Sequence, residues 1–146
     1  MPIAISESSN DHGIGYVFEC RFNGQDLIEA NSKLISMFHS SPEKMKGKRY
    51  FLIDQSSAES FDYSQEEFRT ILDQDRELLA MAADGVMVAI LAPSELHYGF
   101  ARMWEIYTKE WGWDVMIFRE REKAEKWLRD RIKEKYGIEL KGTYKQ

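Results

Sequence analysis

Apolar residues in the second half of the chain alternate between two patterns. Val86–Leu91 and Val115–Phe118 are uninterrupted apolar runs, and the segment after each run carries its apolar residues at helical spacing. Uninterrupted runs are typical of strands that helices cover on both faces, whereas helical spacing gives each helix one apolar stripe. The pattern therefore predicts a helix-covered, largely parallel sheet.

The rest of the chain completes this alternation. We expect five strands, at Ile3–Ser6, Tyr16–Phe22, Tyr50–Asp54, Val86–Leu91 and Val115–Phe118. We expect four helices, whose apolar stripes run over Leu27–Phe38, Phe68–Ala82, Leu96–Tyr107 and Ala124–Ile132. Right-handed crossovers make the last four strands parallel and leave the first as an antiparallel edge. The predicted fold class is α/β, a single-layer mixed, mostly parallel five-stranded sheet flanked by four helices.

Polar and glycine residues mark the expected helix ends. Asn23 is a suitable N-cap for the first helix, and Ser64, with a glutamate three residues later, forms a capping box for the second. Gly112 and Gly137 are expected to end the third and fourth helices. The lysine-rich Pro42–Lys48 segment is expected to be a solvated connection, with contact to an acidic partner as the alternative.

Composition and charge limit the class of protein. A chain of 146 residues, 43% hydrophobic and 31% charged, fits one globular domain, which we expect to span residues 1–140 before a flexible tail at 141–146. The single Cys20 fits a reducing compartment, and no leader pattern opens the chain, so we expect a cytoplasmic protein. A net charge of −5 opposes binding to nucleic acid, and no apolar run reaches the ~20 residues of a transmembrane segment.

Four separated segments together resemble one known family. They are Leu52–Ser56, Leu96–Met103, Val115–Arg119 and Ala124–Leu128. Their order and spacing resemble the SpoIIAA-like branch of the STAS domains, the sulfate-transporter and anti-anti-sigma-factor modules, which are often grouped with lipid-binding Sec14-type domains. The resemblance covers roughly residues 14 to 132.

The resemblance implies a small α/β domain that acts by binding rather than by catalysis, sometimes under control of phosphorylation near the start of the second helix. In the sporulation regulators that site is an Asp-Ser-Ser-Gly loop, which aligns near Phe61–Ser64 here. Only Asp62 and, after a slip of one residue, Ser64 match this loop, and no glycine follows. Ser64 is therefore the candidate phosphorylation site, and a capping role alone is the favoured interpretation.

Ligand-binding residues of open parallel sheets gather beyond the carboxyl ends of the strands. Here that edge and the following helix are expected to supply Asp54, Ser56, Ser57, His97, Tyr98, Arg102 and Arg119. We expect Arg102 to pair with a carboxylate such as Glu105 or Asp54, with an anionic ligand as the alternative. His97 is expected to be a half-exposed helix residue, with proton transfer as the alternative.

Motifs for catalysis and metal binding are missing from the sequence. It has no Gly-x-Ser-x-Gly elbow, no phosphate-binding glycine loop, no dinucleotide fingerprint, and no second histidine or cysteine at metal spacing beside His97. Cys20 is expected inside a strand, and Asp73 and Asp75 on a solvated helix surface. We therefore expect no enzyme activity, no cofactor and no metal.

Apolar residues around the third helix leave two functions open. The core-facing stripe is expected to comprise Leu96, Phe100, Met103, Trp104 and Tyr107. Trp111 and Trp113 flank a glycine turn, where they can contact a partner. The first function is a cytoplasmic STAS-like regulatory module that binds a protein or a second copy of itself. The alternative is a carrier of a small apolar or anionic ligand, in an apolar cleft between the third helix and the sheet, gated by Tyr98, Phe100 and Met103.

Overall fold

A computed structural model describes residues 5–9, 12–62, 64–81 and 86–140 of the chain. Five strands form one sheet in the order β1-β2-β3-β4-β5. Their bounds are Ile5–Ser9 for β1, Gly13–Asn23 for β2, Tyr50–Asp62 for β3, Met87–Leu91 for β4 and Asp114–Phe118 for β5. β1 pairs antiparallel with β2, and each later pair of neighbours is parallel. The predicted mixed sheet with an antiparallel edge is confirmed. The tail expected at 141–146 lies outside the described residues.

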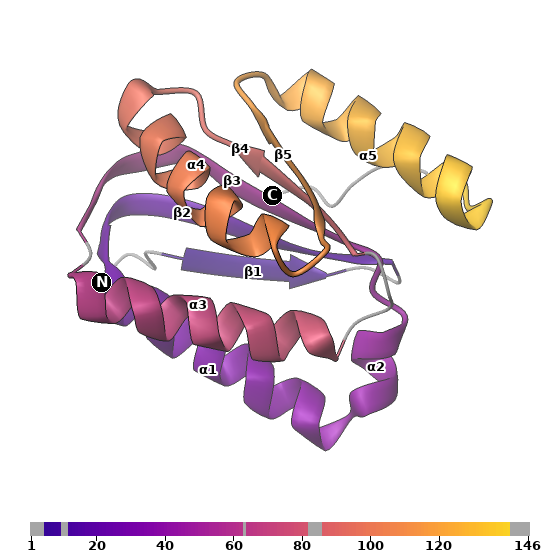
Figure 1. Ribbon diagram of the computed structural model, residues 1–146, viewed down its shortest axis with the longest axis horizontal. Coiled ribbons are helices and arrows are strands. Elements are labelled where there is room, and N and C mark those ends of the chain that lie inside the picture. Colours follow the sequence, from indigo (N-terminus) through magenta and orange to yellow (C-terminus); the bar gives the residue numbers. More distant parts are fainter. Residues whose placement is uncertain (1–4, 10–11, 63, 82–85, 141–146) are drawn as a thin grey trace.

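Five helices cover the two faces of this sheet in the described part of the chain. They are α1 Gly24–Ser40, α2 Pro42–Lys46, α3 Gln65–Ala80, α4 Glu95–Lys109 and α5 Arg121–Tyr136. Figure 1 shows α1 and α3 side by side on one side of the sheet and α5 on the other. Ala101 and Trp104 of α4 join the apolar cluster made by α1, α3 and the sheet, so α4 packs on the same face as those two helices.

One predicted connection is instead a helix. The segment expected to be a solvated link contains α2, a single helical turn in which the Lys44 amide donates to the Ser41 carbonyl over 3.1 Å. Pro42 suits the first helical position because its missing N–H would have no partner there. Glu43 near the start and Lys46 near the end complement the helix dipole, so charge favours this turn as well.

The predicted caps Asn23, Ser64 and Gly137 are present, whereas Gly112, with φ of 81°, lies in the turn beyond the end of α4 at Lys109. Asn23 is extended, its Oδ1 accepts from the Asp26 amide, and Asp26 accepts from the Asn23 amide, each over 3.0 Å. Ser64 and Glu67 make the same reciprocal pair at the start of α3, again over 3.0 Å. Gly137 ends α5 in the left-handed region, with φ of 70°. These contacts satisfy amide and carbonyl groups that a helix leaves without intrahelical partners.

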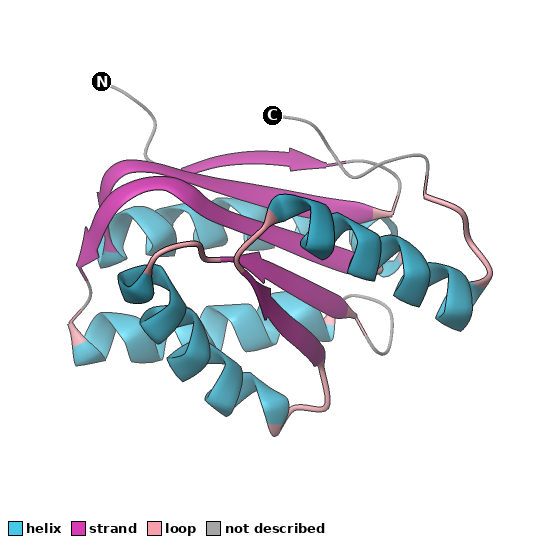
Figure 2. Cartoon of the chain, turned by 90° about the horizontal axis from the view of Figure 1, so that it is seen from above, coloured by secondary structure: helices cyan, strands magenta, loops and turns pink. Residues whose placement is uncertain are grey.

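Two strands are longer than the apolar pattern predicts. Tyr50–Asp54 is only the first part of β3, which continues to Asp62 beside a β2 that also extends beyond its predicted end. Figure 2 shows these two strands curving past the shorter β4 and β5. The extension is mostly polar in sequence and pairs with β2 through its backbone, so an apolar pattern does not detect it.

The buried face of α4 also differs from the prediction. Ala101 and Thr108 are fully buried and Glu105 is 6% exposed, whereas the predicted core residues Met103 and Tyr107 are 40% and 50% exposed. Glu105 can be buried because Arg102 forms an ion pair with it from the preceding turn. The core-facing side of α4 therefore carries both apolar and polar residues, and the apolar residues Met103 and Tyr107 face solvent.

Candidate functional site

Asp54 lies level with the carboxyl ends of β4 and β5. It pairs in register with Leu91, the last residue of β4, which pairs with Phe118, the last residue of β5. Arg121, the first residue of α5, therefore begins its helix beside this row. The predicted position of Asp54 at a strand end was wrong, because β3 continues, but its position at the carboxyl edge of the neighbouring strands is as expected.

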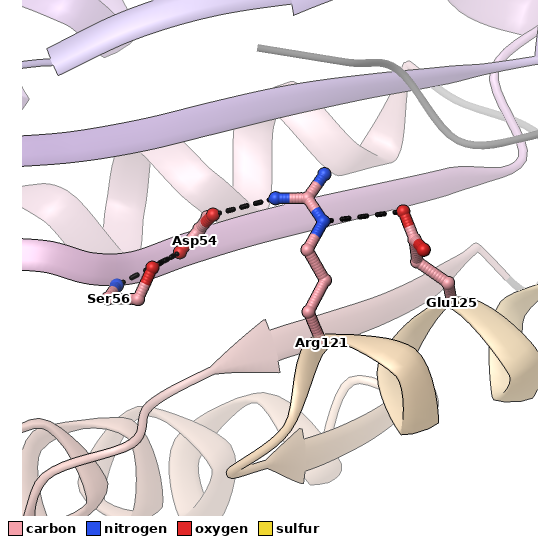
Figure 3. Close-up of polar contacts among 4 residues, drawn as sticks. All are labelled: Asp54, Ser56, Arg121 and Glu125. Atoms are coloured by element: carbon pink, nitrogen blue, oxygen red, sulfur yellow. Dashed lines mark hydrogen bonds and ion pairs between the residues drawn. The ribbon is translucent and has the colours of Figure 1, made fainter.

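The Asp54 carboxylate has partners from two elements. It is 1% exposed, and its Oδ2 accepts from Arg121 Nη1 over 2.8 Å. Arg121 Nε also donates to Glu125 Oε1 over 3.3 Å, so the guanidinium bridges the strand carboxylate and one turn of α5 (Figure 3). A buried carboxylate is tolerated where a cation pairs with it, as Arg121 does here.

Ser56 completes this arrangement through a β-bulge. Gln55 and Ser56 together lie opposite a single residue of β2, since Val17 pairs with Asp54 and Glu19 pairs with Ser57. The bulge removes an amide from the regular ladder. The Ser56 amide and hydroxyl instead donate to Asp54 Oδ1 over 2.9 and 2.5 Å. The exposed Ser57 belongs to the same edge, but its pairing is with Glu19 across the sheet.

Arg119 links the end of β5 to the start of α4. Its guanidinium donates to the Pro93 carbonyl over 3.3 Å and to Glu95 Oε1 over 3.2 Å, and its Cζ lies 4.7 Å from the Tyr98 ring centroid. The structure therefore brings together two of the predicted site residues, Arg119 and Tyr98. The Arg119 side chain is 45% exposed, which leaves it accessible to a partner.

Arg102 does not join Asp54, because α4 and α5 pack on opposite faces of the sheet. It forms an ion pair with Glu105, one of the two carboxylates that the sequence suggested. The Arg102 side chain is 49% exposed. His97 lies on α4, and its side chain is outside the described atoms. The sequence predicted that these residues would share one crevice. The structure instead separates Arg102 from Asp54, on different faces of the sheet.

The predicted tryptophans form a cluster at the turn after α4. The rings of Trp111 and Trp113 meet edge to face at 4.7 Å between centroids, and Trp113 lies 6.2 Å from Trp104. Arg76 of α3 places its guanidinium 5.6 Å from the Trp111 centroid. Both turn tryptophans are half-buried, so their rings contact the protein on one side and solvent on the other.

Asp75 is the polar residue that sequence reasoning placed wrongly. It was expected on a solvated surface, but its carboxylate accepts from Trp104 Nε1 over 2.7 Å and from the buried Asn31 Nδ2 over 3.1 Å. Burial raises its pKa from 3.8 to about 7, against the opposing effect of those two hydrogen bonds. The pairing joins three helices, and no local sequence pattern predicts it.

The polar side chains of Ser64 and Gln55 differ in their contacts. Ser64 is exposed and already engaged in the cap of α3, which matches the favoured capping role. Gln55 is 7% exposed, and its Oε1 has no hydrogen-bond partner among the described residues.

In the described part of the chain, no group of three potential ligands is arranged to hold a metal ion. None of the described helices is long and apolar enough to cross a membrane.

The outer side of α4 carries the main exposed apolar row. Met103, Ile106 and Tyr107 are 40%, 60% and 50% exposed, and they follow the i, i+3, i+4 spacing of one helix face. The Tyr107 ring also meets Phe68 of α3 edge to face at 5.8 Å between centroids. We call these three residues of α4 the α4 row.

Comparisons with known proteins identify the fold. No family model matches the sequence, and no curated protein matches it. The phosphorylated form of the Bacillus cell fate determinant SpoIIAA superposes with a TM-score of 0.54 at 14% identity, over 88% of this chain and 99% of SpoIIAA. A Shewanella loihica protein of the DUF3478 family, solved as a SpoIIAA-like fold, gives 0.51 at 18% identity, over 86% and 92%. The chain therefore has a SpoIIAA-like fold, as the resemblance of its sequence segments implied.

Proposed function

We propose that this protein is a cytoplasmic, non-catalytic regulatory module that binds a protein partner through the α4 row. The proposal rests on how side chains are distributed around α4. The polar residues Glu105 and Thr108 are buried, whereas the apolar residues Met103, Ile106 and Tyr107 are exposed. Large apolar side chains gathered on one exposed helix face are typical of surfaces that another protein covers.

The fold supports a binding role. SpoIIAA, which shares the architecture, is described as a cell fate determinant and was solved in a phosphorylated form. A regulatory module needs a stable scaffold and an accessible surface rather than a reactive centre. The sheet and its two apolar clusters supply the scaffold, and α4 supplies the surface.

Two arginines on or against α4 favour an ordered encounter, Arg102 next to the α4 row and Arg119 at the start of the helix. Arg102 and Arg119 have half-exposed guanidinium groups, each held in place by a carboxylate on α4. A held guanidinium loses little conformational freedom on binding and can donate to a partner while keeping its intramolecular contact. The partner is therefore expected to present an apolar face with polar or acidic groups at its margin.

Partner capture tests this proposal. Wild-type protein and the variants Ile106→Lys and Ser36→Lys are used as baits in native cytosol, and the captured proteins are compared quantitatively. Both substitutions add one positive charge to an exposed helix position, but Ser36 lies on α1, away from the α4 row. We expect one partner to be retained by wild type and by Ser36→Lys and lost by Ile106→Lys. Equal recovery with all three baits would contradict docking at α4.

A carrier of a small ligand is the second candidate. The buried Gln55 Oε1 favours it, because an acceptor without a protein donor can take a hydrogen bond from a ligand hydroxyl or amide. Native mass spectrometry of freshly purified protein separates the two functions. A co-purifying small mass that Gln55→Leu removes supports the carrier, whereas a clean protein mass, monomeric or dimeric, supports the interaction module.

A further inference from the structure

A small polar network joins three helices on one face of the sheet. Asp75 of α3 accepts hydrogen bonds from Trp104 of α4 and Asn31 of α1. Asn31 is fully buried and also donates to Gln74 Oε1 over 3.3 Å. Gln74 in turn donates over 3.0 Å to the Ile28 carbonyl and to the Ser32 hydroxyl. The carboxylate is thus the point at which the α1–α3 network meets α4.

The groups that hydrogen-bond to Asp75 are neutral. Three basic side chains of the packed helices contact other groups: Arg76 lies over Trp111, His39 pairs with Glu77, and Arg102 pairs with Glu105. A carboxylate removed from water with neutral partners is less stable as an anion. Its pKa is accordingly raised to about 7, so its charge changes near neutral pH.

Protonation cannot leave the network unchanged. The Trp104 indole nitrogen can only donate, so a proton on the carboxyl group cannot be directed at Trp104. Where that proton is directed at Asn31, the Asn31 amide turns its oxygen toward Asp75, which removes the donor that now serves Gln74. The Trp104 bond would remain but would lose the strengthening that an ionised acceptor provides.

We propose that Asp75, Asn31 and Trp104 form a proton-controlled latch between α4 and the α1–α3 pair, in which the protonated carboxyl group is compatible with the closed helix layer, whereas ionisation leaves a buried charge and favours release of α4, which returns the carboxylate to water. Trp104 lies one residue from Met103 of the α4 row and packs near Trp113. The latch therefore couples protonation of Asp75 to the packing of α4 against α1 and α3. This inference concerns control of α4 and stands whether or not α4 binds a partner.

Side-chain NMR across about pH 5.5 to 8.5 tests the latch directly. We expect the Trp104 indole N–H and the Asn31 amide N–H resonances to move together, with one midpoint near 7. Asp75→Asn should abolish both movements, whereas Asp73→Asn, at an exposed position on the same helix, should leave them intact. His39→Gln should also leave them intact, which separates the effect of Asp75 from that of the His39–Glu77 pair between α1 and α3.

Two results would overturn the latch. One is that the Trp104 and Asn31 resonances stay fixed across this range, and the other is that their movement persists in Asp75→Asn. If Asp75→Asn does not fold, the carboxyl carbon of Asp75 in the wild-type protein is followed instead. A midpoint near 7 supports the latch, and a midpoint below about 5, close to that of an ordinary aspartate, contradicts it.

Discussion

Asp54 of β3 and Arg121 of α5 form a 2.8 Å ion pair between residues 67 positions apart in the sequence. The pair fixes the first residue of α5 to the middle of a buried strand. The carboxylate also receives the Ser56 amide that the β-bulge releases. One side chain therefore stabilises both an irregular strand and the start of the helix α5, which packs on that face of the sheet.

Asp54→Asn should lower the free energy of unfolding by about 2 to 3 kcal/mol. The amide oxygen can still accept from Ser56, but Arg121 would then face a neutral group at a site where its side chain is only 30% exposed. Urea denaturation at neutral pH measures the change. Glu125→Gln is the control and should cost about 0.5 kcal/mol, because that carboxylate is 27% exposed and one helical turn away. Equal costs for the two variants would contradict a special role for Asp54.

Asp75 should make stability fall as the pH rises. The folded protein binds this proton with a pKa of about 7 and the unfolded chain with its ordinary value of 3.8, so the folded state holds more protons between these values. Stability from this group is complete below pH ~4 and is lost as the pH approaches 7. We expect wild type to lose about 2 to 4 kcal/mol relative to Asp75→Asn over that range. Denaturation of both proteins at several pH values measures this, and a constant difference would contradict it.

Two glycines should respond to alanine in opposite directions. Gly137 has φ of 70°, a conformation unfavourable for alanine, so Gly137→Ala should cost about 1 kcal/mol. Gly99 lies inside α4, and a Cβ there would meet no atom within 4 Å. Gly99→Ala should therefore stabilise the protein by about 0.5 to 1 kcal/mol. Thermal unfolding of the pair measures both effects, and a loss of stability in Gly99→Ala would show that α4 needs glycine at that place.

Ser64→Ala should cost about 1 kcal/mol through loss of the α3 cap. Ser64→Asp should recover most of that loss, since aspartate also accepts from the Glu67 amide at a helix N-terminus. Chemical denaturation compares the two, and the partner-capture experiment should show no difference from wild type for either. If Ser64→Asp folds normally but loses the partner, Ser64 acts as a phosphorylation switch rather than as a cap.

The sheet could be predicted from the sequence because β4 is buried along its whole length and the edge strand β5 carries a similar uninterrupted apolar run. The runs at Val86–Leu91 and Val115–Phe118 match β4 and β5 closely, and the capping residues located α1 and α3. The polar half of β3 was missed because backbone pairing with β2, rather than apolar burial, maintains it. The apolar pattern of the sequence therefore predicts strands with buried apolar side chains and misses a polar strand segment that is recognised by its backbone pairing with a neighbouring strand.

The candidate site was harder to predict because its contacts join distant elements. Arg119 and Tyr98 were both chosen and do meet. Arg121 was missed because the charged run around it looks like a solvated helix surface, and Asp75 was misplaced for the same reason. On α4, the apolar pattern placed Trp104 correctly against the core but wrongly placed Met103 and Tyr107 there, and it missed the burial of Glu105, which Arg102 makes feasible. The side chains of Leu96 and Phe100 lie outside the described part of the structure. Such ion pairs and hydrogen bonds depend on the tertiary structure rather than on residue spacing.

Site-specific photo-crosslinking in the native cell tests the central claim most directly. A photoreactive residue replaces Ile106 in the α4 row, and a second protein carries it at Glu134, an exposed position on α5. We predict one discrete protein adduct from position 106 that is absent from position 134 and disappears when Met103→Glu is added. Adducts of equal yield at both positions, or none at position 106, would contradict the proposal that α4 binds a partner.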